Sequence, residues 1–405
     1  MKISKDKKLC EEYIGKHPVI SISLKGINAA SYEAAFELTV KTIKGAVQKA
    51  GFLKMSDKLD EDEKKEYRAI LDENMSEATL FWSLKNLSEL LEKHYETKVI
   101  LLIDEYDVPL AKAFENGYYD KMVFLIRNLL EQTLKTNNSL KFAVMTGCMR
   151  ISKESIFTGL NNLKVLSITD ERFDEYFGFT DEDVKEMLRY YDREDHYEEM
   201  RNWYDGYRFG STDVYCPWDV LNHCDKIKEN AAAFPENYWV HTSSNEAVKK
   251  IIQMSGNITT KREIERLLAG EEIVKEIRQE LTYQEMYQSV ENIWSLLFMT
   301  GYLTQRQRLD ASHYKLAIPN LEVRDIFKTQ IMEYFKEGVA KDGDTLKQLC
   351  DALKGGDAEK DNQYSRYICE EIIKREFLPW NFARHFRCQR RLGSIFKQGN
   401  RGRVQ

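Results

Sequence analysis

The chain has 405 residues, and its 42% hydrophobic and 12% aromatic content is enough for two or three packed domains and excludes a largely disordered protein. Its 60 Lys and Arg residues nearly balance its 66 Asp and Glu residues, so the net charge of -6 argues against nucleic-acid binding through bulk charge. With neither a signal-peptide-like segment nor a run of about 18 apolar residues, we expect a cytoplasmic protein with no membrane partner.

Alternating strands and helices fill the first 170 residues. Short apolar, β-branched runs predict strands at 19–26, 98–104, 141–147 and 163–170, and helical spacing predicts helices at 32–52, 76–95 and 118–136. The apolar run at 99–103 is typical of a strand buried on both faces. This alternation predicts an α/β fold with a parallel sheet.

Beyond Thr180 the pattern becomes mainly helical, beginning with a capping-box spacing between Thr180 and Asp183. We divide the chain into an α/β core at 1–175, a helical lid at 176–285 and a helical region at 286–380. The last of these is either a small winged-helix-like unit or a plain helical extension.

The carboxyl-terminal segment 381–405 differs from the rest of the chain. It holds seven Lys or Arg residues and no Asp or Glu. We interpret it as a disordered or aberrant terminus, and the alternative is a nucleic-acid-binding tail.

The cysteines are scattered and form no C-x-x-C pair, which indicates buried, reduced thiols. His223 beside Cys224, with Cys216 upstream, comes nearest to a metal-ligand cluster. Its spacing matches none of the usual zinc patterns.

The strongest chemical signal is the strand VILLID, which ends in Asp104 and is followed by Glu105. In a P-loop ATPase the first of two such carboxylates holds the magnesium shell and the next polarises the attacking water. The alternative is a buried strand that ends in solvated acids. A second strand ends at Thr146, where such enzymes place a polar side chain near the γ-phosphate, and Arg150 follows.

Together these motifs are recognisable. LIDEYDVPL, TGCMRISKESIFTGLNNL, ITDERFDEYFGFTDEDVKEML, WYDGYRFG and CPWDVLNH resemble the AAA-ATPase-like family, whose members often carry a carboxyl-terminal PD-(D/E)XK nuclease-like region. The resemblance implies a P-loop NTPase-like parallel sheet, a helical lid, and ATP and Mg²⁺ as ligands. It implies that Asp104 binds Mg²⁺ through water, that Glu105 is catalytic, and that Thr146 and Arg150 lie beside the phosphates.

The sequence departs from that family at the phosphate-binding loop. No segment fits G-x-x-x-x-G-K-[ST], and the closest string, CEEYIGKH at 10–17, reads as a helix end before a strand. We expect a chain truncated at both ends, with a gap in the sheet between the strands at 141–147 and 163–170. A strand pair with the nuclease spacing is also not found.

We therefore expect an AAA-ATPase-like protein whose ATP binding and hydrolysis are impaired by the lack of a phosphate-binding loop. The alternative is a non-catalytic protein-interaction scaffold derived from an ATPase. Expected partners are nucleotide and either a second copy of the chain or a complementing chain that supplies the loop.

Overall fold

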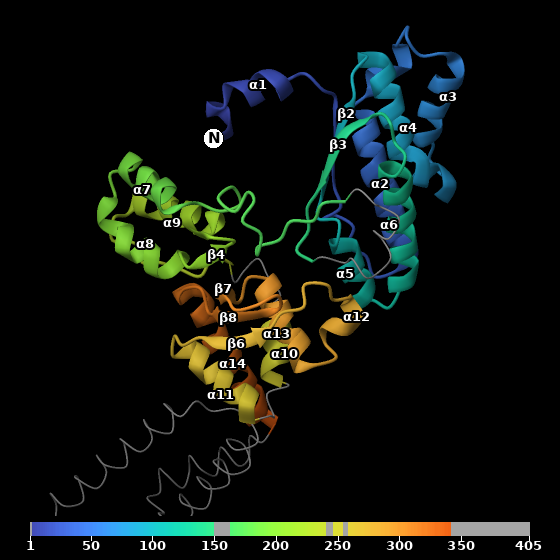
Figure 1. The fold of residues 1–405 in the computed structure, drawn as a ribbon. Coiled ribbons are helices and arrows are strands. Elements are labelled where there is room, and N and C mark those ends of the chain that lie inside the picture. Colours follow the sequence, from blue (N-terminus) through green and yellow to red (C-terminus); the bar gives the residue numbers. More distant parts are fainter. Residues whose placement is uncertain (1, 150–162, 240–245, 254–257, 342–405) are drawn as a thin grey trace, which may run out of the picture. The chain divides into compact units, whose positions relative to one another are not determined.

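A computed structural model describes residues 2–149, 163–239, 246–253 and 258–341 (Figure 1). The chain divides into two compact units, the first made of Met1–Val165 with Gln279–Gln288 and the second of Leu166–Arg278 with Ser289–Gln405. Among the described residues, no helix is both long and apolar enough to cross a membrane. The proposed boundaries at residues 175, 285 and 380 stay predictions.

The first unit is built on a three-stranded parallel sheet. Strand β2 (Val99–Asp104) lies in the centre, between β1 (Val19–Ser23) and β3 (Leu140–Met145). Parallel strands need long crossover connections, which helices supply here. The predicted α/β fold with a parallel sheet is confirmed.

Helices connect and cover the strands of this unit. Figure 1 shows α2 (Tyr32–Gln48), α4 (Glu77–Tyr95) and α6 (Tyr119–Leu134) on one side of the sheet. The predicted start at residue 32 is confirmed, and the helix predicted from residue 76 starts one residue later. Ser31 and Ser76 cap these two helices, each accepting a hydrogen bond from the backbone N–H three residues on. The shorter helical elements are η1 (Lys2–Lys5), α1 (Lys7–Tyr13), η2 (Gly51–Met55), α3 (Glu61–Ile70), α5 (Val108–Glu115) and α12 (Tyr283–Met286).

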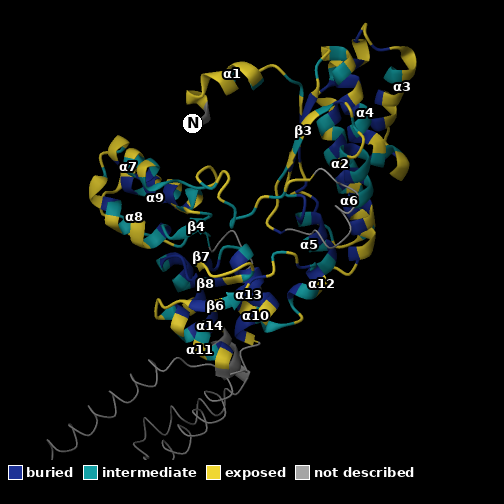
Figure 2. Ribbon diagram, viewed as in Figure 1, coloured by how far each residue is buried: buried dark blue, intermediate teal, exposed yellow. Residues whose placement is uncertain are grey.

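Among the described residues one face of the sheet is covered more fully than the other, and the expected burial of the strand at 99–103 on both faces holds except at Leu102, since Ile100 on the same face is only 8% exposed. Ile22 and Ile103 pair in register and are buried on the helix-covered face. On the other face Leu102, Phe142 and Val144 are 37%, 40% and 46% exposed, and Figure 2 draws β3 in the exposed and intermediate colours. The described helices α2, α4 and α6 pack on one side, so apolar residues on the opposite side keep contact with water.

The predicted strand at 163–170 is wrong. This segment has no strand hydrogen bonding and ends in a turn, in which Asp170 N–H donates to the Ser167 carbonyl and Ser167 N–H donates to the Asp170 carboxylate at 2.7 Å. A strand is stable only when its backbone groups pair with a neighbour. Among the described residues β3 pairs only with β2, and no strand lies next to the segment 163–170 with which it could form hydrogen bonds.

The second unit begins with a helical cluster. It contains α7 (Asp181–Tyr190), η3 (Glu194–His196), α8 (Tyr197–Tyr204) and α9 (Pro217–Glu229), with a hairpin of β4 (Tyr207–Phe209) and β5 (Thr212–Val214) between the last two helices. The predicted capping box of Thr180 and Asp183 is present at the start of α7. Val184, Leu188, Met200, Val220 and Cys224 are among the buried residues that form its core.

The rest of the unit combines helices with an antiparallel sheet of order β6-β8-β7. Its elements are α10 (Glu246–Gln253), α11 (Ile258–Leu268), β6 (Ile273–Glu276), α13 (Val290–Met299), β7 (Thr304–Arg308), β8 (His313–Ala317) and α14 (Leu321–Lys341). The region is therefore not purely helical, and the winged-helix-like unit stays a prediction. The basic segment 381–405 lies outside the described residues.

Candidate functional site

The predicted site residues lie where β2 and β3 end. Asp104 is the last residue of β2, Glu105 follows it, and Thr146 follows β3 directly. The ladder continues past the strand ends, because Thr146 N–H donates to the Ile103 carbonyl at 2.9 Å and Tyr106 N–H donates to the Thr146 carbonyl at 3.1 Å. Two segments about forty residues apart are thereby held side by side at the carboxyl edge of the sheet, where open α/β sheets bind ligands.

The Asp104 carboxylate accepts hydrogen bonds from two neighbouring strands. Thr146 Oγ1 donates to Oδ1 at 2.5 Å, and Ser23 Oγ of β1 donates to Oδ2 at 3.4 Å. Ser23 pairs in register with Asp104, so the sheet itself brings it there. All three side chains are exposed, and the carboxylate can therefore reach a hydrated ion.

Ser23 was not among the residues that the sequence predicted for this site. A signal for it does exist: it is the last, polar residue of the first apolar strand. In a parallel sheet the carboxyl ends of all the strands lie at one edge, so a polar residue at such an end belongs with the others.

Glu105 has a backbone conformation that non-glycine residues seldom adopt. Its φ of 55° lies in the left-handed region, which costs about 1–2 kcal/mol for a residue with a Cβ. The side chain is half-buried beside the exposed Asp104. Strained residues of this kind concentrate at functional sites, which is consistent with a role for Glu105 beyond structure.

Asp107, which the sequence did not single out, anchors the loop that carries Thr146. It is only 3% exposed, and its Oδ2 accepts a hydrogen bond from Met149 N–H at 2.9 Å. Gly147 packs so closely that an added Cβ would lie 2.5 Å from Asp107 Oδ1. Burial, assisted by the nearby charge of Glu105, raises the pKa of Asp107 to about 6.

Arg150, the fourth predicted site residue, lies outside the described residues. The structure thus brings Asp104 and Thr146 into contact, with Glu105 next in the chain. An exposed carboxylate at a strand end has the oxygen chemistry that Mg²⁺ prefers, so Asp104 fits the metal half of a Mg·ATP site.

The residues at 10–17 do not fit the phosphate half of that site. As predicted, they form the end of a helix and a turn before a strand: α1 ends at Tyr13, Gly15 has φ 68°, and β1 starts at Val19. His17 is engaged with the Lys98 carbonyl at 2.8 Å. A phosphate cradle needs a run of backbone N–H groups directed at one point, and this segment supplies none.

Comparison with known proteins agrees with the predicted family and fold. Residues 3–157 match the model of the AAA-ATPase-like family, described as a predicted AAA-ATPase. The chain is also 28% identical over 257 residues to a protein of Azotobacter chroococcum mcd 1 named "Uncharacterized protein in vnfD 5'region". That alignment covers 59% of this chain and 44% of the relative, so the chain spans less than half of the relative's length. No solved structure matches.

The family match covers α1 through β3, including Asp104, Glu105 and Thr146. The amino-terminal region of the chain is therefore similar to this family.

Proposed function

We propose that this AAA-ATPase-like chain binds Mg²⁺ and nucleotide phosphate at the carboxyl edge of the β1-β2-β3 sheet, with hydrolysis impaired by the lack of a phosphate-binding loop. The observation that carries the proposal is the contact of Thr146 Oγ1 with the exposed Asp104 carboxylate, at the end of two parallel strands. In this assignment Asp104 holds the ion through its water shell, and Thr146 orients that carboxylate.

Glu105 is assigned to the attacking water. A carboxylate can polarise water and accept its proton, and this one follows the metal-binding residue directly. Mg²⁺, when bound, would neutralise part of the negative charge of the phosphates. Arg150, four residues after Thr146 in the chain, is assigned to the phosphates with Thr146.

ATP hydrolysis is expected to be impaired because the sequence contains no loop that would bind the phosphates. The usual loop offers several backbone N–H groups and a lysine to the β- and γ-phosphates, and no stretch of the 405 residues has that pattern. Positioning and charge stabilisation supply nearly all of the catalysis in phosphoryl transfer. Their partial loss lowers turnover more than it lowers binding of the metal.

The test is ATP turnover by the purified chain, compared with Glu105→Gln. We expect slow, Mg²⁺-dependent phosphate release, at least tenfold slower again in Glu105→Gln, since the amide cannot take up the proton. Asp72→Asn, at an exposed turn acid that accepts Asn74 N–H at 2.9 Å, is the matched control and should keep the starting rate. Equal rates in the starting chain and Glu105→Gln would remove Glu105 from the mechanism.

A second function, a non-catalytic protein-interaction scaffold, is favoured by the open face of the sheet. Phe142 and Val144 of β3 lie beside Leu102 there, and all three are more than a third exposed. The outer edge of a strand such as β3 can also pair with a strand of another protein. The fitting partner is a complementing chain that adds a parallel strand to β3. A well-folded chain that binds no nucleotide would favour this function.

A further inference from the structure

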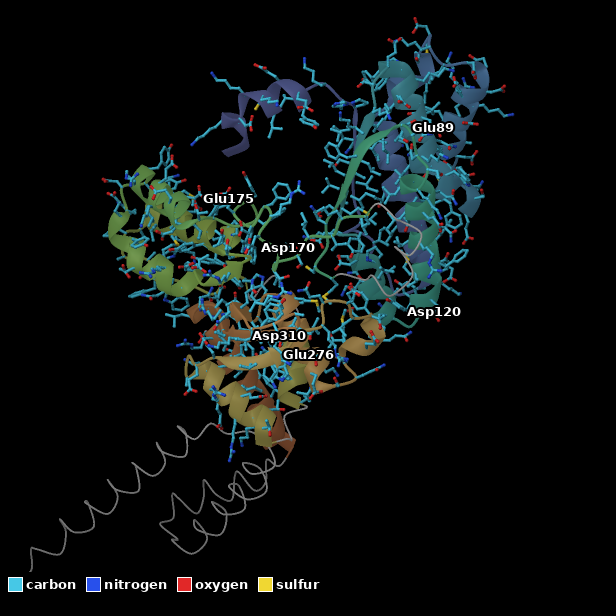
Figure 3. All side chains as sticks on the ribbon, in the orientation of Figure 1. Glu89, Asp120, Asp170, Glu175, Glu276 and Asp310 are labelled. Atoms are coloured by element: carbon cyan, nitrogen blue, oxygen red, sulfur yellow. The ribbon has the colours of Figure 1, made fainter. Side chains whose placement is uncertain are left out.

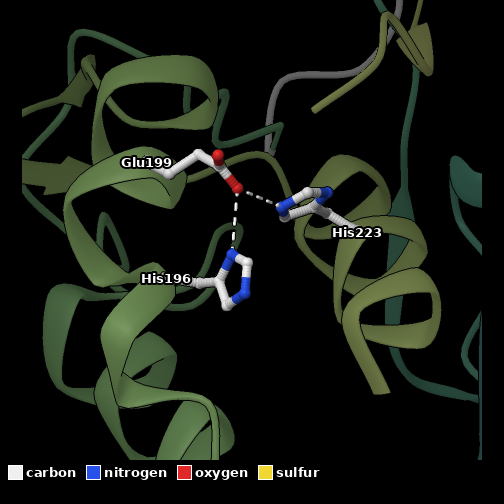
Figure 4. A group of neighbouring side chains, drawn as sticks. All are labelled: His196, Glu199 and His223. Carbon is white, nitrogen blue, oxygen red and sulfur yellow. Dashed lines mark hydrogen bonds and ion pairs between the residues drawn. The ribbon is translucent and has the colours of Figure 1, made fainter. Parts of the chain in front are cut away.

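In the second unit, outside the sheet edge described above, two histidines and a glutamate converge on one point. His196 ends η3, Glu199 lies in the first turn of α8, and His223 lies in α9. The close-up in Figure 4 shows both imidazole rings directed at the Glu199 carboxylate. Their ligand atoms all lie within 4.8 Å of one another.

A single carboxylate oxygen meets both rings. Glu199 Oε1 lies 3.1 Å from His196 Nδ1 and 3.0 Å from His223 Nε2. Ligand atoms about 2.0–2.1 Å from a tetrahedral Zn²⁺ are about 3.3 Å apart. The two contacts of Glu199 Oε1 are thus within a few tenths of an ångström of those around a bound ion. The two histidine nitrogens lie within 4.8 Å of each other, and side-chain rotations would bring all three ligand atoms to one ion.

The hydrogen bonds of His196 also fit a metal ligand. Its Nδ1 faces the Glu199 carboxylate, and its Nε2 faces the Ala231 carbonyl at 2.9 Å. Both partners are acceptors, and a neutral imidazole has one N–H, so it can donate to only one of them. A metal on Nδ1 lets a neutral ring satisfy both sides, with Nε2–H donating to a backbone carbonyl as metal-bound histidines commonly do.

His223 is fully buried and held mainly by packing. The Tyr204 ring lies 5.5 Å from it, and Nδ1 has no hydrogen-bond partner among the described residues. The Glu199 side chain is about a third exposed, which leaves a path for an ion and room for a water ligand.

The nearby thiols are not part of the group. Cys224 packs into the helical core, and its sulfur is not among the ligand atoms that converge. In the sequence, His223 with Cys224 and Cys216 came nearest to a metal-ligand cluster but lacked a zinc spacing, whereas the three-dimensional cluster joins His223 to His196 and Glu199.

We propose that His196, Glu199 and His223 form a Zn²⁺ site with three protein ligands and one solvent position. Two imidazoles and one carboxylate are a common ligand set for this ion. The site links η3 and α8 to α9, so the bound ion stabilises the helical cluster of the second unit. It is independent of the nucleotide site.

The test is calorimetric titration of the metal-stripped full chain with Zn²⁺, together with the thermal unfolding midpoint with and without the ion. We expect about one equivalent to bind and the midpoint to rise. Binding should weaken at least tenfold in His223→Ala and in Glu199→Gln. Because His223 is buried, the near-isosteric Glu199→Gln, checked for folding by circular dichroism, keeps the test decisive if His223→Ala does not fold.

A matched control uses a histidine–carboxylate contact elsewhere in the same unit. His313 Nδ1 lies 3.0 Å from Asp310, which is labelled in Figure 3, and both side chains are about half exposed. His313→Ala should leave Zn²⁺ binding unchanged. Failure of the starting chain to bind Zn²⁺, or equal binding by the folded Glu199→Gln variant, would overturn the proposal.

Discussion

At the scale of single residues, the predicted and the observed sites overlap where the backbone pattern is strong. Asp104 and Thr146 each end an apolar strand, so their position at the sheet edge follows from the sequence. Asp107 gave no such signal, since its burial depends on the loop that returns after β3. The same holds for His196 and Glu199, which meet His223 only through the packing of α8 on α9.

Asp107 should make the stability of the chain depend on pH. Its raised pKa means that the folded state binds the proton more tightly than the unfolded state, whose value is near 3.8. This contribution is complete below pH 3.8 and is lost as pH rises through about 6. Between the two pKa values the free energy of unfolding falls by about 1.4 kcal/mol per pH unit, which amounts to about 3 kcal/mol in total.

The measurement is the free energy of unfolding by urea across this pH range. We expect the free energy of unfolding of Asp107→Asn not to fall in this way between pH 4 and pH 7. An amide does not titrate there, and its oxygen can still accept a hydrogen bond from Met149 N–H. The exposed Asp72→Asn serves as the control and should keep the pH dependence. An unchanged pH profile in Asp107→Asn would contradict the assignment.

At the scale of elements, the helices and the central strands could be predicted, because their periodicity and caps are local. The strand at 163–170 could not, since its apolar run is as suited to a strand as that of β3 but has no neighbour to pair with. The open face of the sheet has the same origin: an apolar strand does not reveal whether helices cover one side or both.

Gly206, in the WYDGYRFG segment, shows an element junction that requires glycine. Its φ is 101°, and an added Cβ would lie 2.1 Å from the Pro319 carbonyl oxygen. Arg306 donates to both backbone carbonyls, that of Gly206 at 3.3 Å and that of Pro319 at 3.5 Å. The segment before β4 is thereby held against the chain that follows β8.

We expect Gly206→Ala to lower the free energy of unfolding by about 2–4 kcal/mol, because strain in φ and a backbone clash add. Thermal or urea unfolding measures it. Gly26→Ala is the matched control, since nothing lies within 4 Å of its Cβ position and it should change stability by less than about 1 kcal/mol. Equal stability of the two variants would contradict this expectation, because it would show that the backbone around Gly206 can move to accept a Cβ.

At the scale of the whole molecule, the first unit carries the AAA-ATPase-like match and the strand-end carboxylate, and the second carries the histidine cluster. The two proposed sites therefore belong to separate compact units. We expect Zn²⁺ binding and nucleotide binding to be lost independently when each site is mutated.

Calorimetric titration of the chain with Mg·ATP, compared with Asp104→Asn, tests the nucleotide site most directly. Asparagine keeps an oxygen for the Thr146 hydroxyl but loses the charge that holds the ion, so the variant should bind at least tenfold more weakly. Saturable, Mg²⁺-dependent binding in the micromolar range, weakened in Asp104→Asn and kept in Asp72→Asn, is the predicted result. Absence of binding up to millimolar ATP, in a chain shown to be folded, would contradict it.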